Sequence, residues 1–311
     1  MNAKKLHFQS IKNAAIVQFQ TDFLNTFDYI SLSEGMKKKL IEVKEISETG
    51  SVNNLMVINR SEFFVFMSDG DILKGAKQNR VLNTSVLIEP DSKTVIPVSC
   101  VEAGRWRHTS HNFGHEEFSA PVHMRSSKAS MVKNSLNEKK RPNSDQGKIW
   151  NEISEYQDSF SIHSETSNLS DVFGSMDNDF DDILKNLKPK TDSNGLAIFV
   201  NGNLLNLEIY NRSAIYNEYF PRLLKGAFLE IFKMKKNERE IQKAEAFYKT
   251  IDFLDNYENI KFELHKGVAA GNEKRFDTPE LSGLELIYID KTIHLAALNL
   301  IKESREFRDY I

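Results

Sequence analysis

The chain is poor in the residues that build disulfide frameworks and membrane spans. Its 311 residues include a single cysteine, Cys100, so no disulfide can form within it. The cross-linked scaffold of a small secreted protein is therefore excluded. No run approaches the ~20 consecutive apolar residues of a transmembrane helix, and residues 1–13 lack the apolar core of a signal peptide. We expect a cytoplasmic protein that does not enter a membrane.

A large excess of one charge is also absent. The 41 Lys and Arg residues nearly balance the 44 Asp and Glu residues, which leaves a net charge of −3. Proteins that bind nucleic acids usually carry a strongly basic surface. We therefore expect no nucleic-acid partner, and any anion must be bound by a local patch.

Several enzyme motifs are missing as well. The sequence contains no Walker phosphate loop, no dinucleotide-binding glycine fingerprint and no Gly-x-Ser-x-Gly elbow. One cysteine also excludes a zinc site built from paired cysteines. A cofactor therefore stays unidentified, and the motifs leave open whether the protein is an enzyme.

Short strands separated by turns dominate the first third of the chain. Residues 41–46 alternate apolar and charged side chains, the period of a strand with one solvated face. Further strands are expected at 14–19, 52–58, 63–67, 81–88 and 94–101. Residues 1–108 are thus predicted to form an antiparallel, β-sandwich-like half.

Hairpins and helices are expected in the last part, residues 148–311. Asn201-Gly202 lies at the centre of a hairpin over 195–210, because both residues tolerate positive φ. A second hairpin is predicted over 283–299, and a long helix over 220–248 with Pro221 in its first turn. The fold class is therefore α+β, with both halves packed as one unit.

Two polar stretches interrupt this pattern. Residues 109–147 contain few apolar side chains and are predicted to be a loop or linker. Residues 159–182 are rich in Ser and Asp. The Asp residues of this stretch are interpreted as the solvated N-terminal end of a helix, because the ordered ligand spacing of a calcium-binding loop is missing.

His108, His111 and His115 raise the alternative of a metal site. Their spacing fits no ordered zinc motif, so no metal ligand is predicted.

The segment from Gly75 to Trp106 contains most of the candidate site residues. Lys77 and Arg80 are cations that can bind a phosphate or carboxylate, and arginine can do so with two parallel hydrogen bonds. Gln78 and Asn83 can both donate and accept. The alternative is a solvated turn with ordinary surface charge.

The end of this segment adds an acid, a further cation and an aromatic ring. Glu102 continues the apolar face of the 94–101 strand, where a carboxylate can line a pocket. Arg105 and Trp106 follow it, and could bind an anion and stack on a ring. Alternatively, Trp106 caps the core and Glu102 pairs with Arg105 or Lys77. Cys100 is interpreted as a small buried side chain.

These residues resemble a known family. Gly75-Ala-Lys-Gln-Asn-Arg80 and Ile96-Pro-Val-Ser-Cys-Val-Glu-Ala-Gly-Arg-Trp106 are similar to the signature of the ADP-ribosylglycohydrolase and rhodanese-phosphatase-associated protein domain, first type. Arg125, Gln146 and Trp150 continue the resemblance. The family implies a link to ADP-ribose and NAD metabolism. It provides no established catalytic residue.

Two hypotheses follow. In the first, the protein binds or processes a phosphorylated nucleotide derivative. Glu102 and Gln78 are then the candidate catalytic residues, and the candidate ligand contacts are Lys77, Arg80, Asn83, Arg105, Trp106, Gln146 and Trp150. In the second, the protein is a noncatalytic scaffold or interaction module, and the same residues form a buried structural network, which must be fully paired to be stable.

Overall fold

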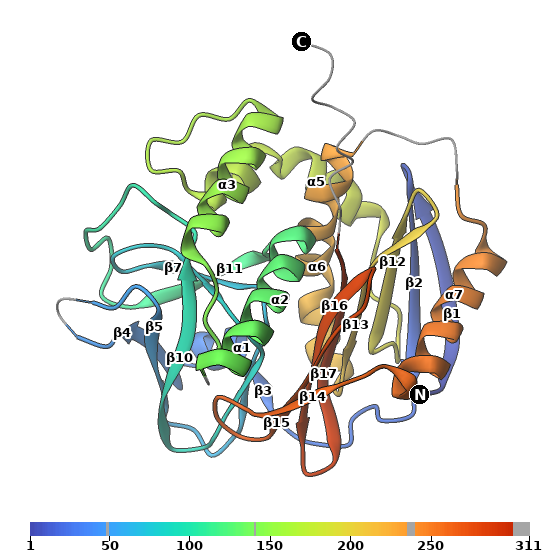
Figure 1. Ribbon diagram of the computed structural model, residues 1–311, viewed down its shortest axis with the longest axis horizontal. Helices are drawn as coiled ribbons and strands as arrows, with labels where there is room; N and C mark the ends of the chain where they lie inside the picture. Colours follow the sequence, from blue (N-terminus) through green and yellow to red (C-terminus); the bar gives the residue numbers. More distant parts are fainter. Residues whose placement is uncertain (48–49, 140, 235–239, 301–311) are drawn as a thin grey trace.

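An eight-stranded antiparallel sheet forms one side of the protein (Figure 1). The computed structural model describes residues 1–47, 50–139, 141–234 and 240–300. In spatial order the strands are β1 (Ala3–Ile11), β2 (Ala14–Thr21), β12 (Gly195–Val200), β13 (Asn203–Tyr210), β17 (Lys291–Asn299), β16 (Leu281–Tyr288), β15 (Asn272–Asp277) and β14 (Glu263–Lys266). The N-terminal strands thus complete a sheet made mainly by the C-terminal half.

The two predicted hairpins are confirmed and lie side by side in this sheet. One is β12–β13, in which both Asn201 and Gly202 have positive φ. The other is β16–β17, in which Asp290 has positive φ. Strand β13 pairs with β17, and Ile209 lies opposite Leu295.

The opposite side of the protein contains two smaller sheets. One has six strands, in the order β11 (Phe113–Ser119), β7 (Asp71–Gly75), β8 (Arg80–Leu82), β10 (Ser92–Cys100), β5 (Asn54–Asn59) and β4 (Ile41–Glu45). The other has three, in the order β3 (Ile30–Ser31), β6 (Val65–Met67) and β9 (Val86–Ile88). Nearly all of these pairs are antiparallel, as expected, but β3 and β6 are parallel. A short helix, α1 (Leu32–Lys37), follows β3.

Two long helices lie between the two sides (Figure 1). Helix α6 (Ser213–Lys233) packs on β12 and β13 of the large sheet and on β11 of the six-stranded sheet. Helix α2 (Val122–Lys139) packs on β15, β16 and β17. The largest apolar core lies along these helices and includes Phe66, Ile198 and Phe220. This core thus contains residues from both the N-terminal and the C-terminal parts of the chain.

The remaining helices cover the outside. Helix α7 (Lys243–Asn256) packs on β1 and β2, on the other face of the large sheet. Helices α3 (Gln146–Phe160), α4 (Leu169–Ser175) and α5 (Asp177–Asn186) follow α2, and a 3-10 turn (Tyr257–Asn259) follows α7. Asp177 and Asp179 lie in the first turn of α5, which agrees with the helix-start interpretation.

Two sequence predictions require correction. Residues 109–147 are not a loop or linker, because they contain β11 and the 18-residue helix α2. The expected helix over 220–248 is two helices, α6 and α7. Helix α6 begins at Ser213, so Pro221 lies inside the helix rather than in its first turn.

Among the described residues, no helix has both the length and the apolar character needed to cross a membrane.

Candidate functional site

The sheet places both ends of the Gly75–Trp106 segment together. Strand β8 pairs with β10 so that Arg80 lies opposite Cys100. The turn that leads into β8 begins at Gly75, which has a φ of 120°. A Cβ at Gly75 would lie 2.4 Å from the Ser110 hydroxyl, so both the backbone conformation and the space require glycine there.

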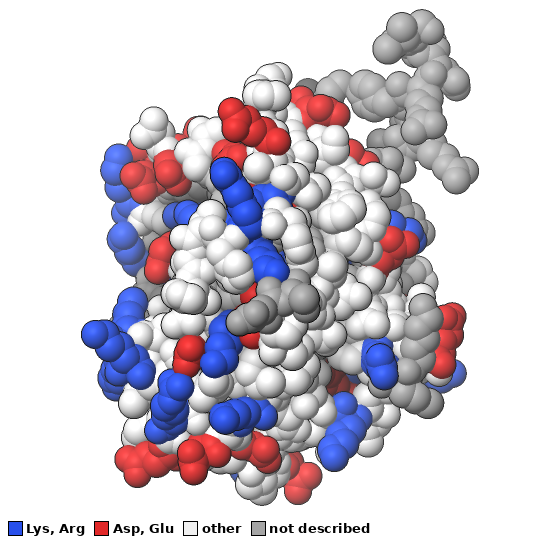
Figure 2. All heavy atoms as spheres, turned by 90° about the vertical axis from the view of Figure 1, so that its left-hand side faces the viewer, with Lys and Arg blue, Asp and Glu red and all other residues white. Residues whose placement is uncertain are grey.

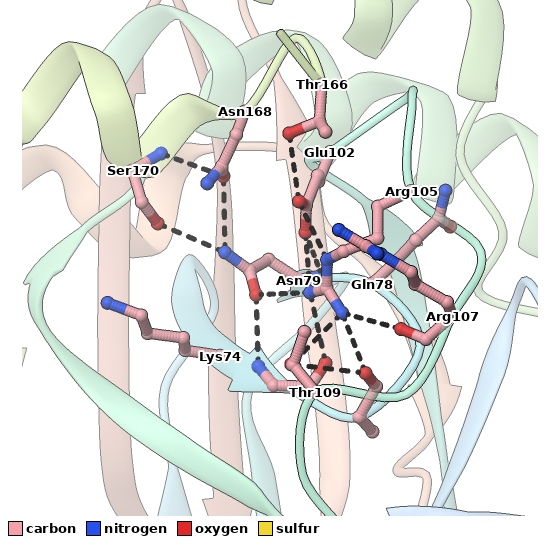
Figure 3. A network of polar contacts seen from close by, with 12 residues as sticks. Lys74, Gln78, Asn79, Glu102, Arg105, Arg107, Thr109, Thr166, Asn168 and Ser170 are labelled. Atoms are coloured by element: carbon pink, nitrogen blue, oxygen red, sulfur yellow. Dashed lines mark hydrogen bonds and ion pairs between the residues drawn. The ribbon is translucent and has the colours of Figure 1, made fainter. Parts of the chain in front are cut away.

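Glu102 and Arg105 form the centre of a polar network in the loop after β10 (Figure 3). Arg105 donates from Nε to Glu102 Oε1 at 2.8 Å and from Nη2 to Oε2 at 2.7 Å. Its Nη1 donates to the carbonyl oxygens of Ala76 and Arg107, at 2.7 and 3.0 Å, and to Thr109 at 3.2 Å. These contacts, with Nη2 also directed at Gly75 and Asn79, occupy the whole guanidinium group.

The Glu102 carboxylate is equally engaged. It accepts from the Asn79 backbone N–H at 3.1 Å and from the Thr166 hydroxyl at 3.0 Å, in addition to Arg105. Burial acts to raise the pKa of Glu102, but the Arg105 guanidinium and the Asn79 N–H more than offset it and hold the pKa below its ordinary value. We call Glu102 and Arg105 the brace, because together they join the turn before β8 to Thr166 and Asn168.

Arg80 lies in a different environment. Its side chain is fully buried, and Nη1 donates to Gln78 Oε1 at 3.1 Å. Within the described part of the chain, Nε and Nη2 have no hydrogen-bond acceptor, and the nearest carboxylate, that of Glu45, is 3.9 Å from Nη2. Burial lowers the pKa of Arg80. Arginine nevertheless stays protonated in proteins, and the Glu45 carboxylate at 3.9 Å is the one anion that forms an ion pair with Arg80 among the described residues.

Trp106 covers Arg80 from the outside. The centroid of its ring is 5.6 Å from the Arg80 guanidinium carbon and 5.4 Å from Lys77 Nζ, so both cations face one indole. Trp106 is 47% exposed, whereas Lys77 is 8% exposed. We call Glu45, Lys77, Arg80 and Trp106 the Arg80 cluster. Gly50 lies against it, because a Cβ there would be 3.1–3.4 Å from Lys77, Glu45 and Trp106.

Glu45 is a site residue that the sequence analysis missed. In β4 the buried positions are Ile41, Val43 and Glu45, so a carboxylate occupies the inward face of an otherwise apolar strand. Both Glu45 carboxyl oxygens are buried and have no hydrogen-bond donor among the described residues. The alternation of residues 41–46 contained the signal, since a charged residue on the apolar face of a strand needs a reason to be there.

Cys100 and Gln146 contribute to the framework of the site. Gln146 Oε1 accepts from the Cys100 N–H and its Nε2 donates to the Cys100 carbonyl, both at 2.8 Å, as a neighbouring strand would do. Burial raises the pKa of the Cys100 thiol to about 11, which keeps it neutral and unsuited to nucleophilic chemistry.

The other predicted site residues lie apart from the cluster or are already bonded. Asn83 accepts from Ser99 at 2.8 Å and donates to the Pro142 carbonyl at 3.2 Å. Gln78, besides accepting from Arg80, donates to the Ala103 carbonyl. Trp150 is 38% exposed on α3, and no contact between described residues joins it to the Arg80 cluster.

The three histidines of the expected loop are not gathered into a metal site. His115 lies in β11, where its Nε2 is 3.0 Å from Asp71, while His108 and His111 are exposed. In the ranges that the structure describes, no group of three or more His, Cys, Asp or Glu side chains is arranged to hold a metal.

A second polar cluster lies where the two sides of the protein meet. Arg125 and Lys128 of α2 form ion pairs with Asp69 at 3.1 and 2.8 Å, and Arg125 also pairs with Glu208 of β13 at 2.6 Å. Burial acts to raise the pKa of Asp69, but the charges of Lys128 and Arg125 more than offset it, so the pKa lies below its ordinary value.

This cluster contains a Ser–His–Glu arrangement that resembles a hydrolase triad. Ser85 Oγ is 2.8 Å from His294 Nδ1, and His294 Nε2 is 2.9 Å from Glu208 Oε2. All three residues are fully buried, and Ser85 Oγ also accepts from the Asp69 N–H. A substrate cannot reach this hydroxyl in the observed conformation, so we assign the arrangement a structural role.

Three cavities of about 710, 580 and 630 Å³ lie elsewhere on the protein. None of the nine site residues predicted from the sequence lines any of them. On the face that includes β4 and β5, Figure 2 shows Lys and Arg side chains spread over the left margin, the centre and the lower half, with Asp and Glu side chains between them and at the top and bottom. The Arg80 cluster is therefore a small cationic site under an aromatic ring rather than a deep pocket.

Together the fold and the site define an α+β protein with two β-rich sides, a shared helical layer and a buried arginine beneath an exposed tryptophan. The chain belongs to the family of the ARG and Rhodanese-Phosphatase-superfamily-associated Protein domain, whose family model matches residues 4–298. It matches no curated protein and no solved structure.

Proposed function

We propose that the protein binds a phosphorylated nucleotide derivative at the Arg80 cluster. The observation that carries this proposal is the Arg80 guanidinium, which is fully buried while Nε and Nη2 have no acceptor among the described residues. An oxyanion held by two parallel N–H groups would supply what this cation lacks, and phosphate has the matching geometry. The family's name associates it with ARG proteins, and the sequence resemblance links it to ADP-ribose.

Binding in this form requires Trp106 to move. Because Arg80 is covered, a phosphate reaches it only when the indole leaves the guanidinium face. The displaced ring, already 47% exposed, then stacks on the base of the ligand. Lys77 would add a second positive charge, and the buried Glu45 carboxylate would accept from ribose hydroxyls. Glu45 thereby takes the role that the sequence suggested for Glu102, whose oxygens are occupied by the brace.

The proposal is for binding rather than catalysis. Glu102 and Gln78, the candidate catalytic residues, have their side-chain oxygens committed to neighbouring donors. Cys100 is a neutral buried thiol. A chemical step would therefore need Glu45 or a group carried by the ligand or a partner.

Calorimetric titration with ADP-ribose tests this function. Arg80→Met keeps the length of the side chain but removes its charge, and should weaken binding by about 10- to 100-fold, the value of a charge-assisted hydrogen bond. Arg60→Met removes an exposed arginine elsewhere and should leave affinity unchanged. If Arg80→Met does not fold, Trp106→Ala should lower affinity about tenfold through lost stacking. Unchanged affinity in a folded variant, or no binding by the wild-type protein, contradicts the proposal.

The brace favours a second candidate, a noncatalytic scaffold or interaction module. Its guanidinium and carboxylate bond to each other and to the surrounding loop rather than to a cavity. Absence of any nucleotide binding, together with loss of folding in Arg105→Ala, would support this candidate over the first.

A further inference from the structure

A polar groove runs between helices α2 and α3. It encloses a cavity of about 580 Å³. Ser127, Ser130 and Asn134 of α2 face Asn151, Glu152 and Glu155 of α3 across it. On α2 these residues are three and four positions apart, and on α3 Glu155 is four positions after Asn151 and three after Glu152, so each set lies on one face of its helix. The groove is separate from the Arg80 cluster, since the two share no lining residue.

Glu152 is the least expected member of this face. Only 8% of its surface is exposed, and the Ser127 hydroxyl donates to its Oε1. Oε2 is buried without a hydrogen-bond partner in the described part of the chain. Burial raises the pKa of Glu152 to about 7. When Glu152 ionises, its buried negative charge loses hydration that the neighbouring described residues do not replace, and a cation beside the carboxylate would offset this cost.

Within the residues that the structure describes, no Lys or Arg side chain pairs with Glu152. Lys128 of α2 lies nearby, but its Nζ is bound to Asp69 at 2.8 Å and to the Leu82 carbonyl. Lys233 of α6 lies 3.9 Å from Glu155 and over the ring of Tyr156.

The other charged or titratable groups around the groove leave its net charge negative. Glu155 adds negative charge from the same helix, and Glu230 of α6 accepts from Tyr156 behind the groove wall. His123 and Lys148 also line the cavity, but no ion pair among the described residues joins either one to Glu152. A cationic group entering from solvent would therefore meet two carboxylates, with amide and hydroxyl acceptors beside them.

We propose that the groove between α2 and α3 binds a small cationic ligand, an amine or guanidinium compound, through Glu152 and Glu155. The amine N–H groups donate to the two carboxylates, and the side-chain oxygens of Asn134, Asn151 and Ser130 accept the remaining N–H groups. Because Glu152 must be ionised to hold a cation, binding is coupled to release of its proton.

The test is calorimetric titration with 1,4-diaminobutane at pH 6 and pH 8. With a pKa of about 7, Glu152 is mostly protonated at the lower pH and mostly ionised at the higher one. Affinity should therefore rise about tenfold from pH 6 to pH 8. At an intermediate pH, the measured heat should also vary with the ionisation enthalpy of the buffer, because a proton is released.

Variants separate this site from general surface attraction. Glu152→Gln should abolish both the binding and its pH dependence, whereas Glu62→Gln removes an equal charge from a distant exposed position and should change neither. If Glu152→Gln fails to fold, the half-exposed Glu155→Gln should weaken binding severalfold. The inference is overturned if millimolar diamine does not bind, if affinity is the same at both pH values, or if the folded groove variants bind like the wild type.

Discussion

Arg105 and Glu102 form a two-point ion pair inside the loop that follows β10. Two nitrogens of the guanidinium meet two oxygens of the carboxylate, Nε to Oε1 at 2.8 Å and Nη2 to Oε2 at 2.7 Å. Both side chains are more than 90% buried. Water therefore cannot solvate either charge, and each buried charge is stabilised by its partner in the ion pair.

Removal of either member of the brace should destabilise the fold strongly. Arg105→Ala leaves the buried Glu102 carboxylate without its counter-charge, although the Asn79 N–H and the Thr166 hydroxyl still donate to it. An unpaired buried charge of this kind costs about 3–5 kcal/mol in the free energy of unfolding. Urea denaturation measures this cost, and Arg107→Ala, whose side chain is exposed, is the matched control. The double variant with Glu102→Ala should lose much less than the sum of the single losses. Additive losses would show that the two residues act independently.

Gln146 should stabilise the protein by replacing a missing strand. Its amide makes two 2.8 Å hydrogen bonds to the backbone of Cys100. Gln146→Ala leaves those backbone groups without a partner and should lower the free energy of unfolding by about 1–3 kcal/mol. Ser154→Ala, at an exposed position of the same helix, should have little effect. Equal stability of both variants in urea would contradict this role.

Glu152 should make the stability of the protein depend on pH near neutrality. Its pKa is about 7 in the folded state, against an ordinary value of 4.5. Between these values the folded state keeps a proton that the unfolded state has lost, so stability falls as the pH rises and levels off above 7. At about 1.4 kcal/mol for each pH unit, the loss approaches roughly 3 kcal/mol.

Glu152→Gln cannot ionise and should not show this loss. The stability of the variant relative to the wild type should therefore rise from pH 5 to pH 8, as measured by urea denaturation at each pH. The comparison cancels the titration of all other groups, including the buried Glu230. A difference between the two proteins that stays constant with pH would contradict the assignment.

The hairpins were predictable because their information is local. Asn201-Gly202 specifies a tight turn by itself, and the flanking apolar residues specify strands. Helix α2 was not predictable from the sequence, because a helix is usually recognised by its apolar periodicity and α2 has little of it. Its buried side includes Arg125 and Lys128, which are stabilised there by Asp69 and Glu208. Those partners are distant in sequence, so no local pattern reveals them.

The candidate site was predictable in composition but not in geometry. The sequence correctly places Lys77, Arg80 and Trp106 in one segment, and the structure brings their side chains together. It does not reveal that Arg105 is saturated by Glu102 and by backbone carbonyls while Arg80 is not. That difference depends on which carbonyl oxygens the loop turns toward each guanidinium, and this is a property of the folded loop.

The most direct test of the proposed function is the fluorescence of Trp106 during a titration with ADP-ribose. The chain has two tryptophans, so Trp150→Phe leaves Trp106 as the single reporter. Stacking on the base should change its emission, and the change should saturate at the concentrations at which calorimetry detects binding. The complementary variant, Trp106→Phe, should show no change from Trp150. Saturable binding without any change in Trp106 emission would contradict the claim that the ligand lies at the Arg80 cluster.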